Sequence, residues 1–318
     1  MSEKIMIEAR GLKLTYDAPN GDKVGVGTSP DGLSFEVRKG EIFGIIGPDG
    51  AGKSTLFRLL ASLLLPQEGS AMVDGEDIIS DYKALRHKIG YMPGNFSLYT
   101  DLTVEENLTF FATIFETTIE ENYHLIKDIY QQIEPFKKRK AGALSGGMKQ
   151  KLALSCALIH APTVLYLDEP TTGIDPVSRV DLWNMLHKLS EMGVTIVVST
   201  PYMDEAKQCH RIAFMQQGQF VAVGKPERLI EEYPYPIYEV SLVPEALRER
   251  LQLLNHLNTL AGKVCSFAFG DTFHLTTQSG VALEDIERHI AADSVLGGVV
   301  SVRPITPTLE DAFLLLSM

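Results

Sequence analysis

The sequence predicts an α/β fold in two domains, a larger one built around buried strands and a smaller α+β one that follows it. Two observations predict the larger domain. An apolar strand at 41–46 leads through a glycine-rich segment into a Leu-rich helix, and a second apolar strand at 164–167 ends in two acids. The third observation is a break rich in proline and tyrosine at 232–236, after which strands and helices alternate as βαββαβ. The predicted domains are therefore residues 1–232 and 233–318.

The composition is that of a globular protein and limits its partners. The chain has 318 residues and a formal net charge of −12. Because affinity for a phosphate backbone comes mainly from Lys and Arg, we expect no nucleic-acid partner. Cys156, Cys209 and Cys265 are far apart, which predicts neither a disulfide framework nor a zinc site. We find no signal peptide and no apolar stretch of the ~20 residues that span a bilayer, so another chain must cross any membrane at which this protein works.

The first elements are predicted to be strands of an antiparallel subdomain. Residues 4–16 and 33–37 alternate apolar and polar side chains, on either side of a polar, turn-rich stretch at 17–31. Residues 69–79 have the pattern of a hairpin around Asp74-Gly75, a dipeptide that favours tight turns.

The glycine-rich segment has the pattern GxxxxGKS and lies between the strand at 41–46 and a helix predicted at 55–65. The backbone N–H groups of such a loop cradle phosphate oxygens at the positive end of the helix. Lys53 can reach the β- and γ-phosphates, and the Ser54 hydroxyl can bind Mg²⁺. Strand, loop and helix together predict a P-loop NTPase core. Its phosphate-binding residues are Gly47, Pro48, Asp49, Gly50, Ala51, Gly52, Lys53, Ser54 and Thr55.

A helical subdomain is predicted at about 95–155. Thr103 and Glu106 have the spacing of a capping box at the start of one helix. A second helix is predicted at 119–133 and a third at 151–160, each from its apolar periodicity.

The strand at 164–167 ends in Asp168 and Glu169. Hydrolysis of Mg-ATP needs an acid in the metal shell and a group that orients the attacking water. Asp168 suits the metal and Glu169 suits the water, whereas the alternative is a strand end with two solvated acids. The remaining elements predicted for this domain are a helix at 180–192, a buried strand at 194–199, a short helix at 204–208 and a hairpin at 212–223.

The tail is predicted to be a split βαβ sandwich. It has no cluster of acids, His or Cys at metal-ligand spacing, and His274 and His289 look isolated. We therefore expect an oligomerisation or regulatory role for it. The predicted strands are 237–243, 264–269, 273–278 and 298–303, and the predicted helices are 244–255, 283–292 and 308–316.

Together these motifs resemble the ATP-binding cassette (ABC) ATPases over the whole first domain. The segment 144–147, with the sequence LSGG, resembles the signature motif of that family. In the family this motif faces the γ-phosphate bound to the opposite subunit. The resemblance therefore implies that Ser145, Gly146 and Gly147 contact ATP in a pair of cassettes, with ATP and Mg²⁺ as cofactors.

Further positions extend or depart from this resemblance. Asp175 lies in a segment that resembles the loop joining the two sites. Tyr16 resembles the aromatic residue that stacks on adenine, with an ordinary core or surface tyrosine as the alternative. Gly94 stands where the family usually has Gln, and Pro201 where it usually has His, so two auxiliary side chains are missing beside an intact Glu169. A weakly hydrolysing or regulatory cassette in a heterodimer therefore stays open.

Residues 307–313 resemble the C-terminal motif of the daunorubicin-exporter type of cassette in bacteria. That resemblance implies a separate membrane permease, ATP-driven export and a peripheral place on the cytoplasmic face of the inner (plasma) membrane. It leaves open the substrate, the transport direction and the choice between a homodimer and a heterodimer of cassettes. Phe96, Leu98 and Tyr99 suit a docking groove for a partner helix, or else a core of the helical subdomain. A cassette acting on ribosomes or DNA is disfavoured by the single cassette, the lack of a heptad arm and the acidic charge.

Overall fold

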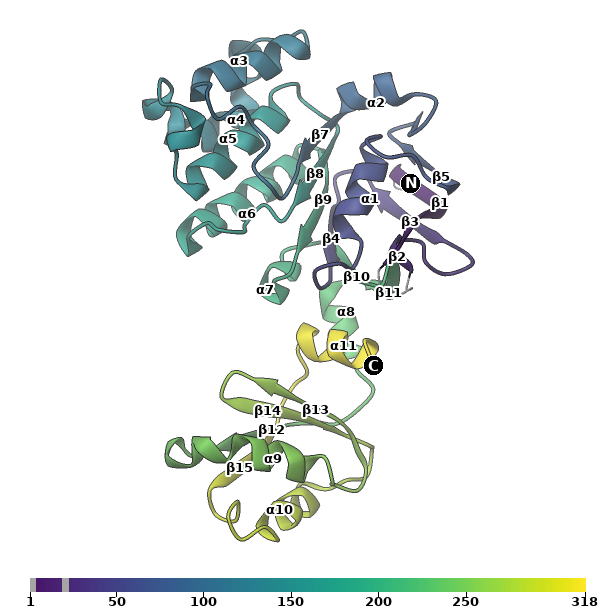
Figure 1. Ribbon diagram of the computed structural model, residues 1–318, viewed down its shortest axis with the longest axis vertical. Helices are drawn as coiled ribbons and strands as arrows, with labels where there is room; N and C mark the ends of the chain where they lie inside the picture. Colours follow the sequence, from purple (N-terminus) through teal and green to yellow (C-terminus); the bar gives the residue numbers. More distant parts are fainter. Residues whose placement is uncertain (1–3, 19–22) are drawn as a thin grey trace. The chain divides into compact units, whose positions relative to one another are not determined.

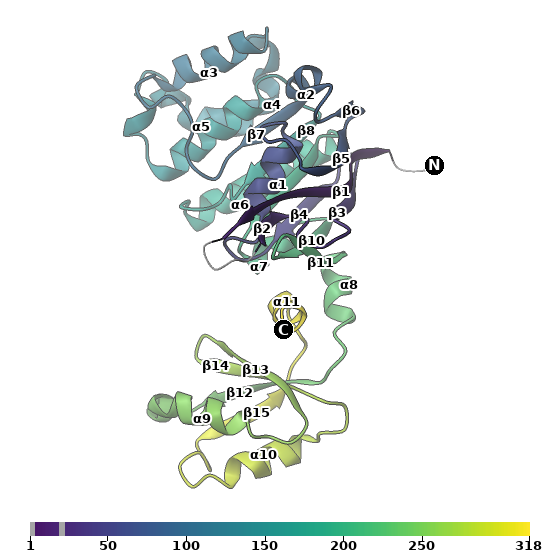
Figure 2. The same cartoon turned by 45° about the vertical axis from the view of Figure 1, so that its right-hand side comes forward.

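The computed structural model describes residues 4–18 and 23–318. They form two compact units, of which the first ends at Pro226 and the second begins at Glu227 (Figures 1 and 2). Each unit has a hydrophobic core of its own. The domain boundary expected from the sequence, after residue 232, stays a prediction.

The first unit is built on a six-stranded sheet with the order β11-β10-β4-β9-β8-β7. Its strands from β10 to β7 are parallel, and only β11 runs antiparallel to its neighbour. Every residue of β4, β8 and β9 is buried, as expected of parallel strands covered on both faces. Their carboxyl ends therefore meet at one edge of the sheet. The strands are β4 (Ile42–Ile46), β7 (Ile89–Met92), β8 (Val164–Asp168), β9 (Thr195–Thr200), β10 (Arg211–Gln216) and β11 (Gln219–Gly224).

A five-stranded antiparallel sheet packs beside it, as predicted. The hairpin at Asp74-Gly75 is confirmed, and both turn residues have positive φ. The stretch 17–31, predicted to be turns, contains a strand, β2, which pairs with the end of β1. The polar, turn-rich composition of the surrounding stretch obscured this strand in the sequence. Of its four residues, Gly25 and Val26 are buried. The strands are β1 (Ile5–Asp17), β2 (Lys23–Val26), β3 (Leu33–Arg38), β5 (Glu68–Val73) and β6 (Glu76–Asp77).

Helix α1 (Lys53–Leu60) lies between the two sheets in both views (Figures 1 and 2). Its buried face includes Leu56 and Phe57, and the Phe57 ring lies 5.9 Å from that of Tyr166 on β8. The predicted end of this helix at residue 65 is wrong. The helix stops at Leu60 and the chain turns at Ser62 with φ of 55°. Beyond the turn Leu63 and Leu65 are exposed, whereas Leu64 packs against the core.

Helices α3, α4 and α5 gather at the end of the unit away from β1 and β3 (Figures 1 and 2). The predicted capping box is confirmed: Glu106 N donates to Thr103 Oγ1, and Thr103 N donates to the Glu106 carboxylate. The predicted helix at 151–160 begins earlier, at the signature-like segment. The helices of this unit are α2 (Tyr82–Lys88), α3 (Val104–Ile114), α4 (Ile119–Ile133), α5 (Gly146–Leu158), α6 (Pro176–Glu191) and α7 (Met203–Ala206), with 3₁₀ turns at Glu134–Phe136 and Ala141–Ala143.

The second unit has an antiparallel sheet with the order β13-β14-β12-β15, which confirms the split βαβ topology. His274 was wrongly expected to be isolated: it is buried, and its Nδ1 lies 2.7 Å from Asp311 Oδ1 on the last helix. His289 stacks on His256 with 4.3 Å between ring centroids. The elements are β12 (Ile237–Leu242), β13 (Lys263–Phe269), β14 (Thr272–Thr277), β15 (Val300–Pro304), α8 (Pro226–Glu231), α9 (Arg250–Leu257), α10 (Leu283–Ala291) and α11 (Leu309–Leu316), with a 3₁₀ turn at Pro244–Glu249.

The predicted fold class is thereby confirmed: an α/β P-loop core with antiparallel and helical subdomains, followed by a small α+β unit. Within residues 4–18 and 23–318, no helix combines the length and the apolarity needed to cross a bilayer.

Candidate functional site

The phosphate loop follows β4 and opens onto helix α1, as the motif requires. Its glycines are needed for close packing. A Cβ on Gly47 would lie 2.1 Å from the carbonyl oxygen of Met215, and a Cβ on Gly52 would lie 2.1 Å from that of Gly25. Gly52 also has φ of 107°, a conformation that L side chains rarely adopt. Glycine at these two positions therefore allows the loop to pack closely at its ends, while the backbone between them faces the N-terminus of the helix.

The ammonium group of Lys53 lies inside this cradle. The side chain is only 5% exposed, and Nζ donates to the carbonyl oxygens of Gly47 and Pro48 at 2.8 and 3.1 Å. The same nitrogen lies 3.7 Å from Glu169 Oε1. A single cation is thus shared between the loop and the acid at the end of β8.

Asp168 and Glu169 have different environments. Asp168 is buried and accepts a hydrogen bond from Ser199 Oγ at 2.7 Å, which fixes the orientation of its carboxylate. Ser199, at the end of the predicted strand 194–199, was not expected to contribute. The sequence did contain one signal for this residue, because Ser199 is a polar side chain at the end of an apolar strand.

Glu169 has φ of 52°, the left-handed region that a non-glycine residue occupies only when its surroundings hold it there. Its N–H lies 3.0 Å from Ser199 Oγ and 3.2 Å from the Ser199 carbonyl oxygen. Its carboxylate accepts a hydrogen bond from Thr172 Oγ1 at 3.3 Å. The backbone conformation thus turns this carboxylate away from the strand and toward Lys53.

Lys53, Glu169 and residues 49–55 of the phosphate loop line one pocket of about 360 Å³. Tyr16, 45% exposed, lines it from β1 together with Val24 and Gly25 from β2. Val24 and Gly25 were missed because strand β2 itself was missed. The predicted residues that the structure brings together here are Tyr16, Asp49, Gly50, Ala51, Gly52, Lys53, Ser54, Thr55 and Glu169.

The signature-like residues lie elsewhere. Ser145 caps helix α5, where its hydroxyl accepts a hydrogen bond from Met148 N. A Cβ on Gly146 would lie 3.1 Å from the Gly173 carbonyl oxygen, so this end of α5 packs closely on the 173–175 loop. Among the described residues that line the phosphate-loop pocket, none comes from either segment.

Asp175 is the N-cap of helix α6 and accepts a hydrogen bond from Ser178 N at 3.0 Å. That hydrogen bond lowers the pKa of the Asp175 carboxyl below its ordinary value. Within one chain, Asp175 therefore lies with the signature-like segment and apart from the phosphate loop.

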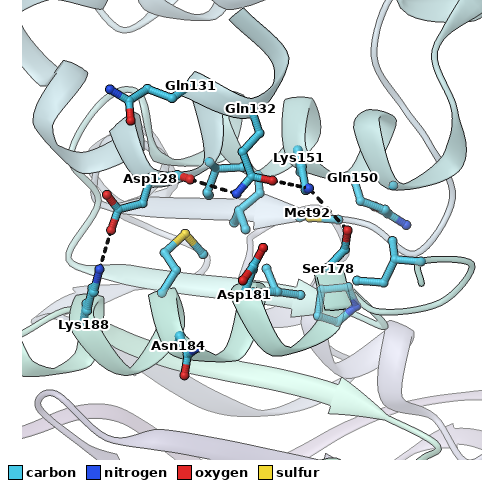
Figure 3. Close-up of a pocket in the computed structure, with 17 residues that line it drawn as sticks. Met92, Asp128, Gln131, Gln132, Gln150, Lys151, Ser178, Asp181, Asn184 and Lys188 are labelled. Carbon is cyan, nitrogen blue, oxygen red and sulfur yellow. Dashed lines mark hydrogen bonds and ion pairs between the residues drawn. The ribbon is translucent and has the colours of Figure 1, made fainter. Parts of the chain in front are cut away.

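A second hollow of about 370 Å³ lies between α4, α5 and α6 (Figure 3). Lys188 pairs with Asp128 at 2.6 Å across one end of it, while Lys151 donates to Gln132 and Ser178 at the other. It is lined by Gly147 but by no described residue of the phosphate loop, and so it is not where a bound phosphate would be cradled.

The two departures from the family pattern lie near the acids. A Cβ on Gly94 would lie 3.3 Å from the Asp168 carbonyl oxygen and 3.8 Å from its Cγ, so a side chain at position 94 would extend past this carboxylate. Pro201 follows directly after β9, whose last residues are Ser199 and Thr200.

The residues present fit a nucleotide and a metal ion. Glycine at positions 47 and 52 lets the ends of the loop pack against the backbone of Met215 and Gly25, and Lys53 supplies the cation that phosphates need. Asp168 is an oriented, buried carboxylate, a donor type that Mg²⁺ prefers. Within the described ranges, no group of three or more His, Cys, Asp or Glu lies together, so the metal would rely on phosphate oxygens, Ser54 and Asp168.

This chain is similar to a family model, to curated relatives and to solved structures. Residues 30–172 match the family model described as ABC transporter. The chain is 38% identical over 311 residues to the "Probable multidrug ABC transporter ATP-binding protein YbhF" of Escherichia coli (strain K12), covering 97% of this chain and 51% of that protein. It is 39% identical over 238 residues to the "Nod factor export ATP-binding protein I" of Burkholderia thailandensis, covering 73% of this chain and 78% of that protein. The chain thus spans about half the length of the first of these relatives.

Solved structures give the same result. The "Structure of ATP binding subunit of ABC transporter" matches with a TM-score of 0.63 at 25% identity, covering 72% of this chain and 93% of that one. The ATP-binding cassette MJ0796, in a dimeric post-hydrolysis state bound to ADP and Pi, matches with a TM-score of 0.62 at 28% identity, covering 69% of this chain and 98% of that one.

Proposed function

We infer that this chain, which belongs to the ABC transporter family of ATP-binding proteins, binds Mg-ATP and hydrolyses it to power export through a separate membrane permease. One observation carries the proposal: the phosphate cradle and Glu169 line the same pocket, with Lys53 Nζ 3.7 Å from Glu169 Oε1. A base and a phosphate-binding cation lie together where the γ-phosphate would be. Release of inorganic phosphate from Mg-ATP is the direct test, and its absence even with the permease bound would refute hydrolysis.

The nucleotide is proposed to bind along the pocket, with Tyr16 against adenine and the 47–55 loop around the phosphates. Lys53 exchanges its bonds to the Gly47 and Pro48 carbonyls for bonds to the β- and γ-phosphates. Ser54 and Asp168 would hold Mg²⁺, which neutralises phosphate charge when bound.

Glu169 is proposed to orient the attacking water. Its carboxylate accepts a hydrogen bond from the water and then takes that proton, while the water oxygen attacks the γ-phosphorus and the bond to the bridging oxygen breaks, leaving that oxygen on ADP. Ser199 supports this geometry, since it holds both Asp168 and the Glu169 N–H. ADP and phosphate are the products.

Two cassettes are proposed to act together. Ser145, Gly146 and Gly147 begin helix α5, an anion-binding position, yet they lie apart from the phosphate loop of their own chain. A second cassette, identical or different, would present the same segment to this pocket. Asp175, beside that segment, would lie at the junction of the two sites.

The permease is proposed to dock on the helical subdomain, which places the chain on the cytoplasmic face of the inner membrane. A hollow of about 260 Å³ there is lined by Leu98, Phe111 and Phe115, among others. Beside it Tyr99 is 52% exposed and packs edge-on against the Phe110 ring, with centroids 4.9 Å apart. Exposed aromatic side chains next to an apolar hollow suit a partner helix.

Tyr99→Glu tests this surface. The new charge would have to be desolvated under a docked helix, so we expect about tenfold less membrane-spanning chain to purify with this protein from detergent-solubilised membranes, with ATP binding unchanged. Tyr235→Glu, at a tyrosine 37% exposed in the second unit, is the matched control. Equal recovery of the same membrane chain with both variants would contradict the docking surface.

The second candidate function, a weakly hydrolysing or regulatory cassette, is favoured by Gly94 and Pro201. We expect the double change Gly94→Gln with Pro201→His to raise phosphate release about tenfold or more with the permease present, since each transition-state donor is worth roughly 10²-fold but such groups act as a unit. An unchanged rate would show that these positions are not limiting. If Asn95→Ala then abolished phosphate release by the parent protein, the Asn95 side chain would be the group that performs the role of the missing Gln and His.

A further inference from the structure

One buried acid in the first unit has no part in the predicted chemistry. Glu205, on the short helix α7, is 2% exposed. Its Oε2 accepts hydrogen bonds from Thr171 Oγ1 at 2.9 Å and from Thr200 Oγ1 at 2.6 Å. Its Oε1 lies 3.2 Å from Arg179 Nε, an ion pair that lacks the alignment of a hydrogen bond. Burial of a carboxylate is costly unless it is paired and hydrogen-bonded, and the partners of this one come from three segments: the loop after β8, the end of β9 and helix α6.

Each segment adjoins a residue of the proposed site. Thr171 follows Glu169 and Pro170 in the loop after β8. Thr200 ends β9 directly before Pro201. Arg179 lies in the first turn of α6, which Asp175 caps. The Glu205 carboxylate therefore contacts residues close in sequence to Glu169, to Pro201 and to Asp175.

The Glu169 backbone depends on such anchoring. Its left-handed φ is held at one side by Ser199 and at the other by the loop that follows, where Thr172 N donates to the Glu169 carbonyl oxygen at 3.2 Å. Glu205 fixes Thr171, the residue next to that bond. Arg179 adds a second tie, since its guanidinium also stacks on Tyr202 with 4.6 Å to the ring centroid.

We propose that Glu205 is a positioning residue for ATP hydrolysis: through Thr171, Thr200 and Arg179 it sets the position of the loop that carries Glu169. The inference rests on the proposed function. Glu205 lines none of the pocket described above and acts only through its partners. Residue 201 offers no side-chain donor, and the Thr200 hydroxyl adds a bond to helix α7 beside the pairing of Thr200 with Ile46 in the sheet.

Paired variants test the two hydroxyls. Val has the shape of Thr without the hydroxyl, while Ser retains it. We expect Thr171→Val and Thr200→Val each to lower kcat about tenfold with the KM for ATP changed less than about twofold, because displaced reacting groups slow chemistry more than binding. Thr171→Ser and Thr200→Ser should retain most of the parent rate. Thr163→Val is the matched control, since Thr163 Oγ1 donates to the Asp74 carboxylate at 3.0 Å at the opposite end of β8.

A measurement that does not depend on ATP hydrolysis tests the positioning role of Glu205 independently of the proposed function. Amide hydrogen exchange should quicken at residues 169–174 in Thr171→Val and Thr200→Val, but not in their Ser counterparts or in Thr163→Val. If the parent hydrolyses no ATP while this exchange pattern appears, the proposed function fails and the anchoring stands. If exchange and kcat are unchanged in the Val variants, or if Thr163→Val slows kcat equally, Glu205 has no positioning role.

The charge is tested separately. Glu205→Gln retains an acceptor for both threonines and removes the attraction to Arg179. We expect it to lower kcat, and we expect Arg179→Met to add less than its own effect in the double variant, because the two act through one ion pair. Fully additive effects on kcat would show that the pair does not act as a unit.

Discussion

Glu169→Gln is expected to lower the rate of ATP hydrolysis by about 100-fold or more while ATP still binds. The amide keeps the size of the side chain and an oxygen that can accept from Thr172, but it removes the carboxylate that takes the proton from water, a contribution of about 10²–10⁴ in rate. Single-turnover phosphate release measures the chemical step. Since hydrolysis would be blocked after closure, an ATP-bound dimer should accumulate and be visible by size-exclusion chromatography with ATP.

The control for this prediction is Glu116→Gln. Glu116 is also a glutamate with positive φ, 56°, but it lies at the end of helix α3, outside the described lining of the pocket. The same chemical change at the same backbone conformation should leave the rate at the parent value. Parent-like turnover in Glu169→Gln would show that another group orients the water and would remove the central residue of the proposed mechanism.

The parts of the fold that the sequence predicted are those whose causes are local. The cradle at Gly47–Thr55 depends on glycines at fixed spacing, and the capping box of Thr103 and Glu106 on two side chains three residues apart. Strand β2 and the end of helix α1 depend instead on contacts distant in sequence. Val26 pairs with Leu14 and is buried in the core, and Arg86 donates to the hydroxyl and the carbonyl oxygen of Ser62 at the turn after the helix.

The same distinction applies to the site. Asp168 and Glu169 could be predicted because an apolar strand ends at them. The roles of Ser199 and Glu205 could not, since Ser199 bonds Asp168 across 31 residues of sequence and Glu205 bonds Thr171 across 34, between segments that the parallel sheet brings to one edge. His274 was missed for the same reason, because its partner Asp311 lies on the last helix. Buried polar side chains in apolar runs were the signal present in the sequence.

Lys53→Ala is expected to lower ATP affinity about tenfold or more. Lys53 is the cation that the pocket directs at the β- and γ-phosphates, and charge-assisted hydrogen bonds are among the stronger ones. A tenfold loss corresponds to about 1.4 kcal/mol of binding free energy, a modest share of what such contacts contribute. Titration with a fluorescent ATP analogue measures it. The carbonyl oxygens of Gly47 and Pro48 also lose a donor, so the free energy of unfolding should fall by about 1 kcal/mol.

Lys13→Ala separates this effect from a change in net charge. Lys13, on β1, pairs with Glu68 at 2.8 Å and is 20% exposed, so its removal takes one cation from the same unit outside the described lining of the pocket. ATP affinity should stay within about twofold of the parent there, since the exposed carboxylate loses only a surface ion pair. Equal affinities of Lys53→Ala and the parent, with both folded, would mean that the cradle does not bind the β- and γ-phosphates and that ATP is held elsewhere.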